Sequence, residues 1–153
     1  MRYPNFGADL AIYNGLGEIA ALVEVKGIRD TSPHWATELR ARMAAKLPRS
    51  AFFLIVTPSE IHLWPGSAAP TEPPSLTLDA RPLLAAYFKR SRIEPEEIWP
   101  EVLEMLVANW LGELTIGIPD ALPDPATPEA LGLRNSGFLD AIRGGHIAYE
   151  DAA

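Results

Sequence analysis

Residues 19–26 (IAALVEVK) constrain the fold of this chain more than any other stretch. In an extended conformation both faces of this segment begin apolar, and only the face that holds Glu24 and Lys26 ends charged. This pattern is typical of a buried strand with two charges at its end. Burying an unpaired acid or base costs several kcal/mol, so we expect these two side chains to have a partner, a metal ion or a reaction to serve.

Composition limits the alternatives. A chain of 153 residues with 48% hydrophobic content can bury one core, so we expect a single domain over residues 1–153. The absence of cysteine excludes disulfides, thiolate zinc sites and a cysteine nucleophile, so a metal would need oxygen or histidine ligands. The sequence has neither a long apolar run nor a signal-peptide pattern, which predicts a cytoplasmic protein with no membrane partner.

Charge is unevenly distributed along the chain. The net charge is −7, but residues 1–50 carry +2 and residues 51–153 carry −9. The basic first part is suited to face a polyanion, although ordinary solvated helix charges explain the same numbers.

The turn before the buried strand controls which side chains face one another. Asn14-Gly15 lies between two apolar runs, a strong signal for a hairpin of antiparallel strands. With a loop of even length, Asp9 shares a face with Glu24. A four-residue loop would pair Tyr13 with Glu18 and Asp9 with Leu22, which leaves Asp9 diagonal to Glu24 at about 7–8 Å. A loop of odd length would separate the two carboxylates.

The remaining pattern predicts an α/β domain, α+β-like in its mixed sheet, with a central sheet of four to five strands flanked by helices. Its core would span residues 4–64, followed by a C-terminal helical extension over 80–153. The expected elements are strands at 6–13, 19–26, 51–57 and 60–64, an exposed loop at 65–78, a linker at 119–128, and helices at 33–47, 80–89, 94–114 and 136–143. The apolar stripe of 94–114 is expected to be core or a dimer contact.

This order of motifs resembles the PD-(D/E)xK nuclease superfamily, which has the restriction-endonuclease-like fold. The resemblance covers residues 4–64: Asp9, a short hairpin, Glu24-Val25-Lys26 on an apolar strand, a helix, and the strand AFFLIVT. It implies a metal-dependent endonuclease that hydrolyses phosphodiester bonds in nucleic acid, with DNA as the expected substrate.

The resemblance also implies roles for individual residues. Asp9 and Glu24 would bind Mg²⁺ or Mn²⁺ together with the backbone carbonyl of Val25, and Lys26 would assist the attacking water. These residue types suit the chemistry, because a hard cation prefers oxygen ligands and a nearby ammonium group stabilises developing negative charge.

Three arginines are candidates for holding neighbouring phosphates, because a guanidinium group can contact a phosphate through two hydrogen bonds. These candidates for nucleic-acid binding are Arg29, Arg40 and Arg42.

The sequence also departs from the family pattern. Members usually begin with a helix that often bears another acid, whereas here only residues 1–5 precede the first strand. A later helix with Glu101 or Glu104, or a partner chain in a homodimer or larger complex, would then supply a third acid.

Two other interpretations remain open. In the first, the chain is a non-catalytic protein-interaction module that retains the nuclease-like fold and binds a partner through its acidic helical part. In the second, it is an ordinary structural domain in which Glu24 and Lys26 pair only with each other.

Overall fold

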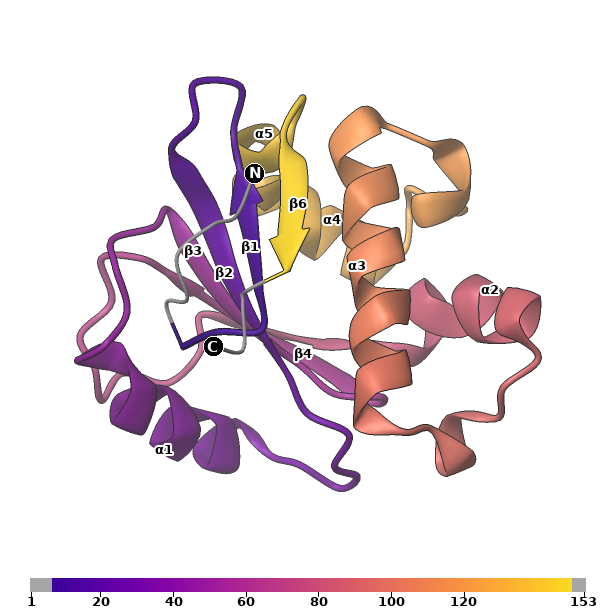
Figure 1. The fold of residues 1–153 in the computed structure, drawn as a ribbon, viewed down its shortest axis with the longest axis horizontal. Coiled ribbons are helices and arrows are strands. Elements are labelled where there is room, and N and C mark those ends of the chain that lie inside the picture. The colour runs from indigo at the N-terminus through magenta and orange to yellow at the C-terminus, as the bar shows by residue number, and fades with distance from the viewer. Residues whose placement is uncertain (1–6, 150–153) are drawn as a thin grey trace.

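The computed structural model describes residues 7–149, which form an α/β domain around one mixed open sheet (Figure 1). The sheet has six strands in the order β5-β4-β3-β2-β1-β6. The strands are β1 (Leu10–Tyr13), β2 (Ile19–Val25), β3 (Phe52–Val56), β4 (Glu60–Pro65), β5 (Leu76–Asp79) and β6 (His146–Tyr149). The helices are α1 (Pro33–Ala44), α2 (Arg81–Ser91), α3 (Pro100–Ile116), α4 (Pro128–Asn135) and α5 (Phe138–Ile142), with short 3₁₀ turns at Pro95–Glu97 (η1) and Pro119–Ala121 (η2).

The buried strand lies at the centre of the sheet, as its two apolar faces predict. Strand β2 pairs antiparallel with β1 and parallel with β3, and helix α1 makes the crossover between the two parallel strands. All other neighbours in the sheet are antiparallel. The predicted start of the first strand at Phe6, and residues 4–6 of the predicted core, lie outside the described residues.

The helices form a layer on each face of the sheet. Of the described helices, α1 packs on one face, over Ala11, Leu22, Ile55 and Trp64. Helices α2 to α5 pack on the opposite face, and α3 is the longest of them. The apolar stripe of α3 is buried in this layer, which makes it core rather than a dimer contact. In Figure 1, α1 lies on one side of the sheet, and α2 and α3 lie on the other.

The sheet has more strands than the four or five predicted. Strand β5 lies inside the segment expected to be a loop, because a run of only four residues among prolines gives a weak strand signal. Strand β6 follows Gly144-Gly145 and pairs with β1. A side chain at Gly145 would meet the carbonyl oxygen of Tyr13 at 2.2 Å, so the chain can enter β6 only with glycine there.

Several helix boundaries also differ from expectation. The predicted helix at 94–114 divides into η1 and α3, and Pro100 occupies the first turn of α3, where its missing N–H is not needed. The predicted linker at 119–128 contains η2 and leads directly into helix α4, which the sequence pattern did not indicate.

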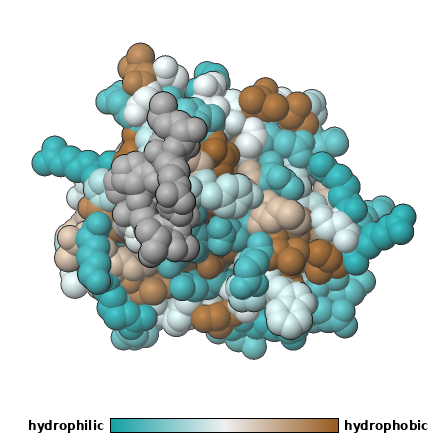
Figure 2. Space-filling model, in the orientation of Figure 1, coloured by the Kyte–Doolittle hydropathy of each residue, from teal (hydrophilic) through white to brown (hydrophobic). Residues whose placement is uncertain are grey.

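Surface hydropathy is mixed. On the face shown in Figure 2, outside the grey atoms, hydrophobic residues form separate patches among hydrophilic ones. None of the helices within residues 7–149 has both the length and the hydropathy required to cross a membrane.

The turn between β1 and β2 is closed by the side chain of Asn14, which gives a first prediction. Its Oδ1 accepts hydrogen bonds from the backbone N–H groups of Leu16 at 2.9 Å and Glu18 at 3.0 Å. We expect Asn14→Ala to lower the free energy of unfolding by about 1 kcal/mol in urea titrations. Leu16→Ala is the control, because Leu16 is 85% exposed and its loss should change stability by less than about 0.5 kcal/mol. Equal effects of the two substitutions would show that the Asn14 hydrogen bonds do not hold the turn.

Candidate functional site

The register of the β1–β2 hairpin brings Asp9 to Glu24. Leu10 pairs with Val23, and continuing this register by one residue sets Asp9 opposite Glu24. The expected pairing of Asp9 with Leu22 is therefore wrong, and the two acids lie closer than the predicted diagonal arrangement.

A β-bulge makes this register possible. Tyr13 pairs with Ile19 rather than with Glu18, so the loop has five residues, an odd number. Ile12 pairs with Ala21, which leaves Ala20 as one extra residue in β2. A bulge shifts the pairing by one residue. It therefore returns Asp9 and Glu24 to the same face of the sheet, which an odd loop alone would have prevented. The loop length alone was thus the wrong criterion for whether the acids face each other.

Asp9 is fixed to the backbone of the neighbouring strand. Its Oδ2 atom accepts a hydrogen bond from the N–H of Val25 at 2.7 Å, and the side chain is half-buried. This bond holds the Asp9 carboxylate at the end of β2, beside the backbone of Val25, the residue between Glu24 and Lys26.

Glu24 is a buried acid with one oxygen in use. The residue is only 7% exposed, and its Oε2 atom lies 3.3 Å from Nζ of Lys26. Its Oε1 atom is buried and has no hydrogen-bond partner among residues 7–149. Burial first, and then the neighbouring Asp9 carboxylate, raise the pKa of Glu24 to about 7, against the opposing effect of Lys26. Glu24 therefore loses its proton only near neutral pH.

Lys26 reaches from the sheet toward solvent. Its backbone N–H continues the pairing with β3 by donating to the carbonyl of Val56 at 2.9 Å, while its side chain is 38% exposed. The ammonium group thus lies beside a buried carboxylate and remains accessible.

Helix α3 brings a further acid toward Asp9. Glu104 is half-buried, and its pKa is raised by burial first and then by the negative charges of Asp9 and Glu101. Glu101 itself is exposed in the first turn of α3. Of the two acids considered from the sequence, Glu104 is the one that interacts with Asp9. Within the described part of the chain, no three His, Asp or Glu side chains are close enough together to hold a metal ion.

Tyr149 is a neighbour of this acid that sequence reasoning missed. It ends β6, opposite Leu10, and its pKa is raised by burial and by the charge of Glu104. No sequence signal indicated Tyr149, because strand β6 was not predicted.

The three candidate arginines have different surroundings. Arg40 is buried, stacks over the Trp64 ring at 5.4 Å, and donates to the carbonyls of Ala69 at 2.8 Å and Ala68 at 3.0 Å. Burial lowers the pKa of this guanidinium group. Its contacts give Arg40 a structural role, so the expected phosphate contact is not supported. Arg29 is exposed and donates to the carbonyl of Glu96, and Arg42 is exposed on α1.

A buried histidine, His62, lies on the same face of the sheet as Glu24. His62 is opposite Ile55, which is opposite Glu24, so one strand separates the two side chains. The ring is fully buried, its Nδ1 is 3.1 Å from the hydroxyl of Thr77, and burial lowers its pKa. His62 is therefore a neutral packing residue near neutral pH.

Comparisons with known proteins yield no match: no family model fits the chain, and no curated protein or solved structure is detectably similar to it. The residues and their geometry are therefore the basis for the function proposed below.

The raised pKa of Glu24 predicts a pH-dependent stability. In the folded protein this carboxyl keeps its proton up to a pH of about 7, whereas the unfolded chain releases it above 4.5, so stability falls as pH rises between these values. We expect Glu24→Gln to raise the free energy of unfolding by about 2 kcal/mol at pH 8 and to change it little at pH 4.5.

The control for this measurement is Glu97→Gln, because Glu97 is exposed in η1. This variant should match the wild type at both pH values within about 0.5 kcal/mol. A Glu24→Gln variant that is less stable than the wild type at pH 8 would contradict the assignment of Glu24 as a destabilising buried acid.

Proposed function

We propose that this chain is a metal-dependent nuclease of the PD-(D/E)xK type, which hydrolyses phosphodiester bonds in DNA. The observation that carries this proposal is the buried carboxylate of Glu24, with Lys26 at one oxygen, no partner within residues 7–149 for the other, and Asp9 beside it. A purely structural ion pair needs neither the second acid nor an unpartnered oxygen.

The arrangement of the elements supports the restriction-endonuclease-like core. A hairpin carries Asp9 on its first strand and Glu24 on its second, helix α1 crosses over, and β3 returns parallel to β2. The parallel pair places the ends of both strands at one edge of the sheet, where substrates bind in open α/β sheets.

The donor set fits Mg²⁺ or Mn²⁺. Magnesium is commonly held by one or two carboxylates together with waters and substrate phosphate, so a pair of acids suffices. Asp9 and Glu24 would supply the carboxylates, Val25 a carbonyl oxygen, and Glu104 a nearby acid for water-mediated contact. When bound, such an ion neutralises charge on the phosphate and lowers the pKa of a water ligand.

The residues around the two carboxylates position the reacting groups and stabilise negative charge on the phosphate. The hydrogen bond from Val25 N–H holds Asp9 in place, which reduces the reorganisation needed when substrate binds. Lys26, half-exposed beside Glu24, would orient the attacking water and stabilise negative charge on the phosphate. Arg42 on the exposed side of α1 remains available for a flanking phosphate.

A non-catalytic interaction module is the second candidate, and one observation favours it. Trp99 is 72% exposed immediately before α3, and three exposed glutamates surround it in sequence, at positions 96, 97 and 101. Exposed tryptophan is enriched in protein interfaces, and this acidic setting would suit a basic partner.

Calorimetry with Mg²⁺ tests the metal site. We expect the affinity at pH 6 to be about tenfold weaker than at pH 8, because the proton on Glu24 must leave when the ion binds. Asp9→Asn and Glu24→Gln should each weaken binding at least about tenfold, whereas Glu97→Gln should bind as the wild type does. Binding that is indifferent to both site substitutions would remove the metal-site claim.

A plasmid-nicking assay tests catalysis separately. We expect Lys26→Ala to retain Mg²⁺ binding and to lose at least about 100-fold in cleavage rate, because it removes charge stabilisation at the reacting phosphate. Lys46→Ala is the matched control, since Lys46 is an exposed lysine beyond the end of α1. Equal cleavage by the wild type and Lys26→Ala would contradict the proposed role of Lys26. Metal binding without cleavage by the wild type would favour the interaction module.

A further inference from the structure

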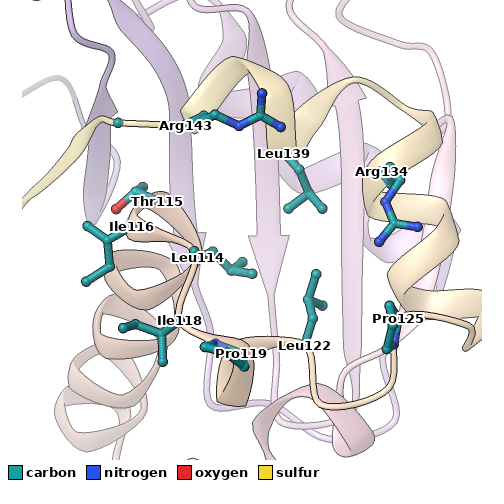
Figure 3. A pocket seen from close by; sticks show the side chains of 12 residues that line it. Leu114, Thr115, Ile116, Ile118, Pro119, Leu122, Pro125, Arg134, Leu139 and Arg143 are labelled. Carbon is teal, nitrogen blue, oxygen red and sulfur yellow. The ribbon is translucent and has the colours of Figure 1, made fainter.

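A second candidate site lies at the far end of helix α3. A cavity of about 640 Å³ opens between the C-terminal turn of α3, the η2 turn, α4 and α5 (Figure 3). Leu114 and Glu104 are ten residues apart on α3, which corresponds to about 15 Å along the helix axis. The cavity is thus separate from the acids near Asp9.

The walls of this cavity are mainly apolar. The apolar lining comes from α3, from α5 and from the residues on either side of η2, and consists of Leu114, Leu139, Ile118 and Leu122. In Figure 3 the side chains of Leu122 and Leu139 point toward each other across the cavity. A cavity of this volume with apolar walls is typical of small-molecule sites.

The charged residues at the cavity are basic, whereas the surrounding part of the chain is acidic. Residues 51–153 carry a net charge of −9, yet Arg134 and Arg143 line the cavity and none of its described lining residues is acidic. Both guanidinium groups lie at the cavity in Figure 3, Arg143 beside Leu139 and Arg134 above Pro125.

Both guanidinium groups are available to a ligand. Arg134 is exposed at the end of α4, and its side chain has no hydrogen-bond or ion-pair partner among residues 7–149. Arg143 donates to Asp140 at 2.8 Å, but both side chains of this pair are more than 70% exposed, and exposed pairs contribute little. An anion in the cavity can therefore recruit either arginine at small cost.

We propose that this cavity binds a small molecule with an apolar body and one anionic group, such as a carboxylate, sulfonate or phosphate ester. The apolar body lies between Leu122 and Leu139, and the anionic group accepts hydrogen bonds from Arg134 and Arg143. A guanidinium group offers two parallel donors to such a planar or tetrahedral anion. This site does not depend on the nuclease proposal.

A pair of matched fluorescent probes tests this site in the full chain. The anionic probe is 1-anilinonaphthalene-8-sulfonate, and the neutral probe is N-phenyl-1-naphthylamine, which has the same ring system without the sulfonate. We expect the anionic probe to bind one site per chain and to bind more tightly than the neutral one. Arg134→Gln and Arg143→Gln should each weaken the anionic probe about fivefold to tenfold and leave the neutral probe unchanged.

Arg49→Gln is the control variant, because Arg49 is exposed and outside this cavity. It should bind both probes as the wild type does. Methyl NMR supplies a readout of location: the anionic probe should shift the resonances of Leu122 and Leu139.

Four outcomes would overturn the proposal. Equal binding of the two probes, or anionic binding unaffected by both arginine substitutions, would show an apolar surface without an anion site. Methyl shifts that omit Leu122 and Leu139 would place the probe elsewhere. A dimer in sedimentation that Ile118→Ser dissociates would assign this face to a second copy of the chain.

Discussion

The placement of Glu24 beside Asp9 is the constraint on which the candidate site depends. Two acids at the end of a buried strand repel each other, and burial raises the pKa of Glu24 to about 7. Two contacts offset the cost of placing these acids together. Lys26 lies at one oxygen of Glu24, and the N–H of Val25 donates a hydrogen bond to Asp9. The remaining buried oxygen has no partner in the described chain, which is the arrangement expected where a cation or a reaction supplies the missing interaction.

The hairpin and helix α3 together set the surroundings of this pair. The bulge at Ala20 turns Asp9 and Glu24 to one face of the sheet, and the α3 helix brings Glu104 toward Asp9 from the C-terminal part of the chain. The same helix ends at the apolar cavity with Arg134 and Arg143. One helix therefore contacts both candidate sites, and the acidic part of the chain contributes residues to each.

The sequence predicted the features that depend on local pattern. The apolar run of β2, the turn at Asn14-Gly15 and the proline start of α1 each have a strong local signal, and all three are confirmed. The bulge was not predictable, because a single extra residue such as Ala20 leaves the apolar pattern of the strand intact. Strands β5 and β6 are too short to stand out, and Arg40 is buried only because a distant loop at residues 68–69 folds over it.

The titration of the Glu24 carboxyl carbon, followed by ¹³C NMR with and without Mg²⁺, tests the central claim most directly. We predict a midpoint near pH 7 without the ion and a midpoint at least about one unit lower when Mg²⁺ is bound, because the cation replaces the proton on Glu24. A midpoint near 4.5 that Mg²⁺ does not change would contradict both the raised pKa of Glu24 and the metal site.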